Sequence, residues 1–398
     1  MKSKKGSFSL MKRMNINLII NLIRKSGSIS RIDIAKKTGL TAATVTNLTS
    51  ELLEFGIIKE YSMGASTGGR KPVLLKMNSK RFYLASAYIS PMNVEVAVSD
   101  CGAEFVFYRH EKPFSDEFTP ENCIDFIAKS LEKFVSQSGC TIAGLGVGLH
   151  GIVNSEEGII VNAPNLGWKN VAIKRIIEEK TKLPVYVDND VRLMAMAETW
   201  FGADQNIGDF AFLYVGRGVG GAVLSSGELM RGKRESAAEI GHTVIDMNGP
   251  LCECGKRGCL QAHVSESAMQ KRLEKYSVTE SVLNHESDCN AIVDAYLNNG
   301  DELAKKIIDD EIRFLSVGVS NLISTFDPCC VVISSSIKNF DIAVMEKLSQ
   351  TVNENDIGRL ENNCVVRYST VGERAVLKGA VAAVLSEIYN NPAEFNAT

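Results

Sequence analysis

The chain has 398 residues, of which 45% are hydrophobic and 23% are charged, and its net charge is −3. This composition is that of an ordinary globular protein and excludes disorder, a collagen helix or a coiled coil for the bulk of the chain. The small net charge hides an asymmetry, because residues 1–72 hold 13 Lys and Arg against 4 Asp and Glu whereas the remainder is acidic. A basic head on an acidic body favours a polyanionic partner for the head alone.

The N-terminus is basic, but the apolar run that follows it, Ile16–Ile23, is interrupted by Asn17 and Asn21. We therefore predict no signal peptide, and no segment approaches the ~18 apolar residues of a membrane span. The ten cysteines are scattered except for one cluster, which favours reduced thiols and a metal site over a disulfide framework. We expect a cytoplasmic protein.

Three helices are expected in the basic head. Apolar residues recur at helical spacing between Ile16 and Ile23. Ser30 has the properties of an N-cap for a second helix, Arg31–Thr38, and Thr41 has those of a cap for a third. The inward face of the third helix would be formed by Val45, Leu48 and Leu52.

Two short helices separated by a turn with Gly39 are typical of a helix-turn-helix, whose second helix enters the DNA major groove. Two strand-like runs, 56–61 and 73–77, flank a Gly-rich basic loop and predict a wing. We therefore expect a winged helix-turn-helix DNA-binding domain over residues 1–80. A protein-interaction module is the alternative.

The DNA contacts are expected from two places in this domain. The start of the third helix offers small and polar side chains to bases or nearby phosphates. The wing offers cationic groups to the phosphate backbone or a narrow minor groove. The predicted DNA-binding residues are Thr41, Thr44, Asn47, Arg70 and Lys71.

Beyond residue 80, the pattern changes to strands in succession and then to alternating helices and strands. Such a sequence predicts a mixed α/β fold. We expect one domain over 81–398 with two lobes, 81–190 joined by the C-terminal helix, and 191–375. The helices are predicted at 122–136, 174–180, 191–201, 310–324, 342–348 and 375–388.

A glycine run, Gly216–Gly221, partly resembles a dinucleotide-binding fingerprint. That motif needs a strand before it and a helix after it, whereas 218–224 reads as a second strand. We therefore expect a tight turn between two strands, whose bare backbone approaches a ligand or phosphate. A plain hairpin turn is the alternative.

Three thiols, those of Cys252, Cys254 and Cys259, lie within eight residues, and His242 lies ten residues before the first of them. Three cysteines and one histidine complete a tetrahedral Zn²⁺ site of the closed, structural kind. A disulfide would leave one thiol odd and suits a secreted protein better. Reactive thiols are a further alternative.

Three stretches place polar groups beside tight turns: Asn165 near Trp168, Asp188-Asn189-Asp190 between a strand and a helix, and Glu239 just before His242. Amides, carboxylates and imidazole suit a polyhydroxylated ligand, because each hydroxyl both donates and accepts. Helix capping by Asp188 and Asn189 and a surface turn at Asn165 are the structural alternatives.

Together these motifs resemble the ROK family, which contains repressors, open reading frames and sugar kinases. The resemblance implies an actin-like, two-lobed sugar-binding body fused to the winged helix-turn-helix, with a structural zinc and a homodimer or homotetramer. The matching residues are Pro164-Asn165-Leu166, Asn189-Asp190, Gly216, Gly218, Gly220-Gly221, Glu239–His242, Cys252, Cys254-Gly255 and Gly258–Leu260, and Gly68–Pro72 resembles the wing of the repressor branch.

The family match also implies a sugar pocket, in which His242 would both ligate zinc and touch the sugar. At one position the chain departs from the family, because Gln261 stands where a Glu is usual. The sugar-binding residues implied are Asn165, Asn189, Asp190, Glu239, His242 and Gln261.

A second departure concerns catalysis. Kinases of the family open the body with an Asp-x-Gly-x-Thr phosphate loop, but here Tyr88 replaces the acidic residue and Ser90-Pro91 replaces the Gly pair. These residues remove the N–H groups and the room that phosphates need. Asp190 matches the kinase general base, yet a base without a nucleotide site transfers no phosphoryl group, so we expect no catalytic residue.

The sequence thus predicts a sugar-responsive repressor of carbohydrate-utilisation genes that leaves an inverted-repeat operator when a sugar or sugar derivative binds. The inducer would be of the xylose, N-acetylhexosamine or glucose type. The first alternative is an ATP-dependent sugar kinase with an accessory N-terminal domain. The second is an interaction protein whose basic head docks on an acidic partner.

Overall fold

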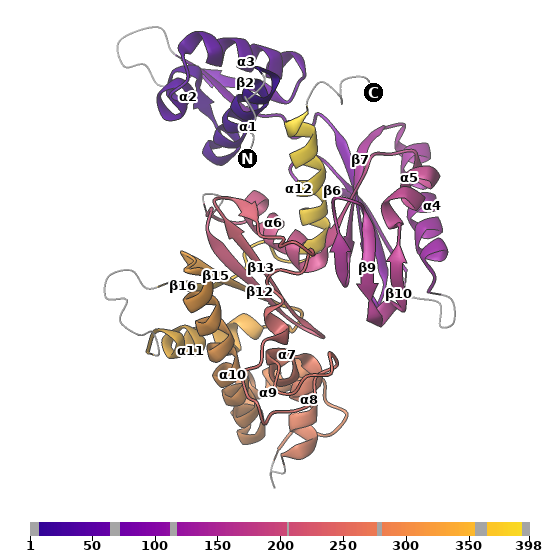
Figure 1. Cartoon of the computed structure of the whole chain (residues 1–398), viewed down its shortest axis with the longest axis vertical. Helices are drawn as coiled ribbons and strands as arrows, with labels where there is room; N and C mark the ends of the chain where they lie inside the picture. The colour runs from indigo at the N-terminus through magenta and orange to yellow at the C-terminus, as the bar shows by residue number, and fades with distance from the viewer. Residues whose placement is uncertain are drawn as a thin grey trace. The chain divides into compact units, whose positions relative to one another are not determined.

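The computed structural model describes residues 8–63, 72–111, 118–204, 207–276, 281–354 and 364–391. The chain forms two compact units (Figure 1): Met1–Phe201 with Arg374–Thr398, and Gly202–Glu373. Within the part of the chain that the structure describes, no helix is long and apolar enough to cross a membrane.

The head of the first unit is a winged helix-turn-helix. The Ser30 hydroxyl accepts a hydrogen bond from the Asp33 N–H, and Gly39 ends the second helix with φ 71°. The predicted bounds of the second helix, Arg31–Thr38, are confirmed, and so is the start of the third helix directly after the cap Thr41. The elements are α1 (Phe8–Ser26), α2 (Arg31–Thr38), α3 (Ala42–Glu54) and a sheet in the order β1 (Ile29–Ser30), β3 (Val73–Met77), β2 (Ile58–Met63).

The predicted wing strands are confirmed, because β2 and β3 pair antiparallel. The loop that joins them, including Arg70 and Lys71, lies outside the described residues.

The rest of the first unit is built on a five-stranded sheet. Three neighbouring strands run parallel, and two antiparallel strands extend one edge. In sheet order the strands are β11 (Val185–Asn189), β7 (Ile142–Leu149), β4 (Tyr83–Ile89), β5 (Val94–Ser99) and β6 (Phe105–Glu111). Two helices, α4 (Pro120–Ser138) and α5 (Ile173–Thr181), share a core with this sheet, as does a small sheet of β8 (Ile152–Asn154), β9 (Ile159–Ala163) and β10 (Trp168–Val171).

The helices α6 (Asp190–Phe201) and α12 (Ala375–Asn390) pack closely on the sheet and on each other. Every second residue of β7 from Gly144 to Gly148 is glycine, and a Cβ on Gly146 would lie 2.2 Å from the Ala380 carbonyl oxygen. A Cβ on Gly379 would lie 1.9 Å from the Leu193 carbonyl oxygen. The small residues therefore let α12 lie directly on the strand and against α6.

The head shares a core with the C-terminal helix. Ile20 and Ile23 of α1 belong to one apolar cluster with Leu385 and Ile388 of α12, and all four side chains are buried. The head is thus packed on the rest of the first unit rather than joined to it by chain connectivity alone, although Ile23 and Leu385 are 362 residues apart in sequence.

A polar and aromatic contact accompanies this shared core. The Arg24 guanidinium lies 4.5 Å from the centre of the Trp200 ring and donates to the Thr199 carbonyl oxygen at 3.0 Å. Trp200 in turn stacks on Tyr389, with ring centres 5.9 Å apart. Burial lowers the pKa of Arg24 to about 10, so the side chain keeps its charge at neutral pH.

We expect Trp200→Ala to weaken the attachment of the head, because it removes the indole from both Arg24 and Tyr389. Cation–π contacts in partly desolvated sites contribute up to about 2 kcal/mol, and truncation of a packed Trp costs about 3–5 kcal/mol. Urea unfolding and tryptic cleavage within the head measure the effect. Trp200→Phe keeps an aromatic ring and should lose less, and equal stability of the Ala variant and the wild type would contradict the role of the contact.

The second unit has its own five-stranded sheet and a large apolar core. The sheet order is β14 (Glu228–Leu229), β13 (Val219–Ser225), β12 (Phe210–Val215), β15 (Cys330–Ser335), β16 (Val365–Tyr368). The helices are α7 (Leu260–Val264), α8 (Glu266–Lys275), α9 (Cys289–Asn299), α10 (Glu302–Phe326) and α11 (Phe340–Glu354).

Candidate functional site

The third helix presents the predicted recognition face. Val45, Leu48 and Leu52 are buried, whereas Thr41 and Asn47 are exposed. The Thr41 hydroxyl accepts from the Thr44 N–H at 3.1 Å and lies 2.9 Å from the Thr44 hydroxyl. The start of α3 therefore offers Thr41, Thr44 and Asn47 on one side, and their contact with DNA stays a prediction.

In the first unit, Asp190 is the centre of a polar cluster. It follows β11 as the first residue of α6 and is 5% exposed. One carboxylate oxygen, Oδ1, accepts from Asn189 Nδ2 at 3.0 Å and from the Val191 N–H at 2.9 Å. The other, Oδ2, accepts from the Tyr88 hydroxyl at 3.1 Å and lies 3.2 Å from His150 Nδ1. Two partners on each oxygen match the approximately four acceptor sites of a carboxylate.

The sequence prediction missed Tyr88 and His150 as neighbours of Asp190. His150 directly follows β7, which lies between β4 and β11 in the sheet. Because the carboxyl ends of parallel strands meet at one edge, a polar residue just after β7 could have signalled this site. The His150 ring also joins a predicted sugar-binding residue to the cluster, since its Nε2 lies 3.3 Å from Asn165 Nδ2.

Asn189 caps α6. Its side-chain oxygen accepts from the N–H groups of Val191 and Arg192, and its Nδ2 donates to the Gly151 carbonyl oxygen at 3.0 Å. This arrangement matches the structural alternative raised from the sequence. Contact of Asn189 with a sugar stays a prediction.

The turn at the predicted phosphate-loop position is closed on itself. The Ser90 hydroxyl accepts from the N–H groups of Met92 and Asn93, and the Ser90 N–H donates to the Asn93 carbonyl oxygen. Pro91 has no N–H group. Three backbone donors of this turn are therefore already engaged within the turn, and an anion would have to displace these bonds.

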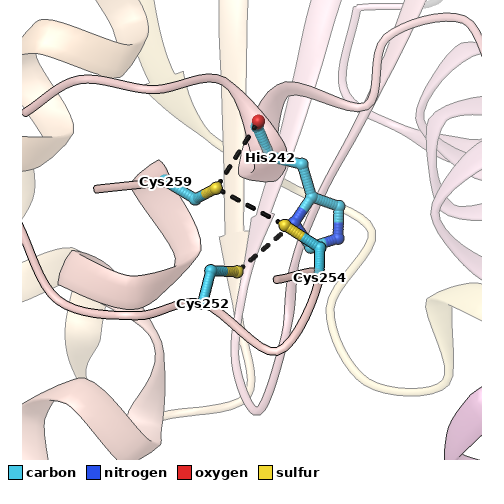
Figure 2. Close-up of side chains that lie close together, drawn as sticks. All are labelled: His242, Cys252, Cys254 and Cys259. Atoms are coloured by element: carbon cyan, nitrogen blue, oxygen red, sulfur yellow. Dashed lines mark hydrogen bonds between the residues drawn. The ribbon is translucent and has the colours of Figure 1, made fainter. Parts of the chain in front are cut away.

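The second unit brings the predicted metal ligands together. One ligand atom from each of His242, Cys252, Cys254 and Cys259 lies within 4.8 Å of all the others. Figure 2 shows the side chains converging, with His242 Nδ1 3.6 Å from Cys252 Sγ and Cys254 Sγ 3.6 Å from Cys259 Sγ. A tetrahedral ion with ~2.3 Å bonds to sulfur has edges of about 3.8 Å. The residues therefore fit a four-coordinate metal ion.

The local backbone explains why these residues converge. Gly255 and Gly258 have φ values of 87° and 69°, in the left-handed region that favours glycine. A Cβ on Gly258 would also lie 1.5 Å from the Asp246 carbonyl oxygen. The turns that bring three thiols to one point therefore require glycine at these positions.

Burial favours the protonated form of the innermost thiol. It raises the pKa of Cys259 to about 12, and the neighbouring Cys254 and Cys252 act in the same direction. A bound cation reverses this preference because it stabilises thiolates directly.

The remaining predicted sugar-binding residues of the second unit lie around the same loop. Gln261 Oε1 accepts from the Val219 N–H at 3.1 Å. Glu239 is exposed and immediately precedes the short helix Ile240–His242. Thus Asn165, Asn189 and Asp190 belong to the first unit, and Glu239, His242 and Gln261 belong to the second.

The glycine run forms the expected turn between two strands. β12 and β13 pair antiparallel, and the Gly216 N–H donates to the Gly218 carbonyl oxygen at 3.0 Å. No helix follows, so the dinucleotide fingerprint is excluded for this run. A Cβ on Gly221 would lie 2.7 Å from Ile240, which shows that the hairpin packs against the loop before His242.

A buried polar network anchors the helix that follows Cys259, and sequence reasoning missed it. Arg272 donates to Glu311 Oε2 at 2.9 Å and to the His263 carbonyl oxygen at the end of α7. Glu311 and Arg272 are 0% and 9% exposed. The network ties α7 and α8 to the long helix α10.

The fold and clusters define a class: a winged helix-turn-helix packed on a mixed α/β body with a Cys/His cluster. Residues 93–387 match the ROK family, and residues 16–59 match the winged helix-turn-helix DNA-binding family. The chain belongs to the ROK family.

The named relatives align over most of this chain. It is 32% identical to the xylose repressor of Caldicellulosiruptor bescii, over 97% of this chain and 99% of that protein. The crystal structure of a ROK family transcriptional regulator, a homologue of the E. coli Mlc protein, is 26% identical, with a TM-score of 0.83 over 97% of this chain and 99% of that chain. A ROK family glucokinase from Streptomyces griseus is 24% identical, with a TM-score of 0.65 over 75% of this chain and 98% of that chain, and shares the fold of the body.

Proposed function

We propose that the protein is a sugar-responsive DNA-binding transcriptional repressor without kinase activity. The observation that carries the proposal is the pairing of an intact helix-turn-helix with a body whose phosphate-loop position is closed. Ser90 engages the N–H groups of Met92 and Asn93, and Pro91 supplies none. A nucleotide phosphate finds no ready backbone donors in such a turn.

The surroundings of Asp190 differ from those expected of a kinase base. A general base must accept a proton from the substrate hydroxyl, so a substrate would first have to displace a hydrogen-bond partner from one of its carboxylate oxygens. Tyr88, which occupies one of them, stands where the kinases of the family have an acidic residue. A coupled ATP-consumption assay with D-glucose, D-xylose and N-acetyl-D-glucosamine tests this part, and turnover above the no-sugar rate would overturn it.

We also propose that His242, Cys252, Cys254 and Cys259 hold a structural Zn²⁺. Three thiolates and one imidazole are a donor set that zinc prefers, and a four-protein-ligand site leaves no open position for substrate. Three of the donors lie on one loop and the fourth lies on the short helix before it. This arrangement supports a structural role for the zinc, which would hold the loop together.

The repressor would act as a homodimer or homotetramer on an inverted-repeat operator. In a dimer, two recognition helices read half-sites separated by about one helical turn or a multiple of it. The protein would be cytoplasmic, in the same compartment as its operator DNA. Relief of repression requires that the sugar bind the operator-bound and released states with different affinities.

The central test is release from DNA. Operator fragments selected from random DNA with the full-length protein provide the probe, and fluorescence anisotropy measures the affinity with and without each sugar. We expect one sugar, with D-xylose the first candidate because of the named relative, to weaken operator binding by at least ~10-fold. If the protein binds DNA sequence-selectively but no sugar alters the affinity, DNA binding is supported and the proposed sugar response is overturned.

Neutralising Arg70 and Lys71 tests the wing. If both side chains contact phosphates, the double Ala variant should reduce the slope of log affinity against log salt by about 2, since each contact contributes about 1. Anisotropy at a series of salt concentrations measures the slope. The matched control is Lys129→Ala with Lys133→Ala, two exposed cations on α4 of the body, which should leave the slope unchanged. An unchanged slope in the wing variant would overturn the assignment.

A further inference from the structure

His150 lies between two residues of the proposed sugar site. The ring nitrogen Nδ1 is 3.2 Å from Asp190 Oδ2, and Nε2 is 3.3 Å from Asn165 Nδ2. The His150 side chain is 32% exposed, whereas that of Asp190 is 8% exposed. The imidazole therefore forms the middle, half-buried link of a polar chain that runs from the exposed Asn165 to the buried Asp190.

The hydrogen-bond partners of the His150 ring determine which of its two nitrogens carries the proton. Asn165 Nδ2 carries only donors, so Nε2 of His150 must accept from it. Nδ1 then holds the proton and donates to Asp190. The same bond turns the amide nitrogen of Asn165 toward His150 and leaves the amide oxygen and the second N–H as its other hydrogen-bonding groups.

The neighbourhood of Asp190 determines what a ligand can do there. Oδ2 has two partners, the hydroxyl of Tyr88 and the ring of His150. Tyr88 extends from the strand β4, whereas His150 follows the end of β7. A ligand can take the place of His150 on Oδ2 and leave the bond from Tyr88 intact.

A hydroxyl group fits this exchange. It can donate to Asp190 Oδ2 and accept from the Nδ1–H of His150 at the same time, so every polar atom keeps a partner. A deoxy carbon at this point separates the Nδ1–H of His150 from Oδ2 without replacing their hydrogen bond, so that Oδ2 loses one of its two partners and keeps Tyr88. An O-methyl group cannot donate. Sites built to bind a hydroxyl discriminate strongly against analogues that lack it, because their own buried polar groups lose partners.

We propose that His150 is a specificity-determining residue of the sugar site. It selects ligands with a free hydroxyl between its Nδ1 and Asp190 Oδ2, and it positions Asn165 and Asp190 around that hydroxyl. The inference rests on the proposed sugar response. The ligand class is a sugar with this hydroxyl unsubstituted.

The test uses the full-length protein and isothermal titration with D-xylose, D-glucose and N-acetyl-D-glucosamine, followed by deoxy analogues of the sugar that binds best. We expect His150→Ala to weaken the best sugar by at least ~10-fold and to reduce its advantage over the deoxy analogue. His150→Asn can place an amide N–H near the position of Nδ1 and should recover part of both, whereas His150→Gln should not. His110→Ala removes an exposed histidine of β6 in the same unit and should change neither.

Two results separate failure of this inference from failure of the proposed function. If the wild-type protein binds a sugar and His150→Ala binds it with the same affinity and selectivity, only the role of His150 is overturned. If the wild type binds no sugar, both the proposed sugar response and the proposed role of His150 are overturned. Nitrogen-15 chemical shifts of His150 give an independent check without ligand: protonation at Nδ1 is expected, and protonation at Nε2 would overturn the hydrogen-bond assignment.

Discussion

Replacing Cys252 by Ser is expected to abolish stoichiometric zinc binding and to destabilise the second unit. Cys252 is 4% exposed, and its sulfur lies 3.6 Å from His242 Nδ1 in the four-residue cluster. Zinc binding by structural sites contributes about 10–16 kcal/mol of apparent free energy in small domains, far more than a packing defect. We expect about one zinc per chain in the wild type, close to none in the variant, and a loss of at least ~3 kcal/mol in the free energy of unfolding.

The matched control for this experiment is Cys289→Ser. Cys289 is a buried thiol at the start of α9 in the same unit, with the same 4% exposure, and it lies outside the cluster. The Cys289→Ser variant should keep its zinc. Its free energy of unfolding should fall only by the smaller amount that accompanies an apolar-to-polar change in the core. Zinc content by mass spectrometry of the native protein and thermal unfolding with and without a chelator measure both variants. Equal zinc content in the two variants would refute the assignment.

Asp190→Asn is expected to weaken sugar binding about 10- to 100-fold while operator binding without sugar stays within about twofold. The carboxylate accepts from four groups. An amide in its place keeps one oxygen for the Val191 N–H and turns an NH₂ group toward Tyr88 and His150. A hydrogen bond to a charged group contributes about 1.5–3 kcal/mol, which corresponds to this loss of affinity. Titration calorimetry and operator anisotropy measure the two effects.

A suitable control for Asp190→Asn is Asp301→Asn. Asp301 is a similarly buried carboxylate, 7% exposed, which caps α10 and accepts from the N–H groups of Leu303 and Ala304. It should lower stability without changing sugar affinity. If both variants lose sugar affinity in proportion to their loss of stability, the effect of Asp190→Asn is one of folding and its role in the site is refuted.

The sequence by itself determined the local features of this protein. The caps Ser30 and Thr41 and the stop at Gly39 were predictable because each acts on a backbone group within a few residues. The metal cluster was predictable for the same reason, since its four ligands lie within the span 242–259 and glycines provide the turns. Apolar periodicity was sufficient to find α4, α5, α6 and α12, but the predicted start of α10 was eight residues late and the predicted end of α11 six residues early. The helices α8 and α9 were not predicted. The short strands β8–β10 and the short helix α7 have too few residues for a clear period.

Only the tertiary structure decided which distant residues meet. Asp190 receives Tyr88 from 102 residues away and His150 from 40 residues away, because β4, β7 and β11 lie side by side in one sheet. The head and α12 share a core for a similar reason: α12 approaches the sheet closely where β7 has glycines, and its outer face is left for α1. Strand order and helix docking depend on how complete apolar surfaces fit together, and this fit is a property of the folded chain that no local pattern of residues contains.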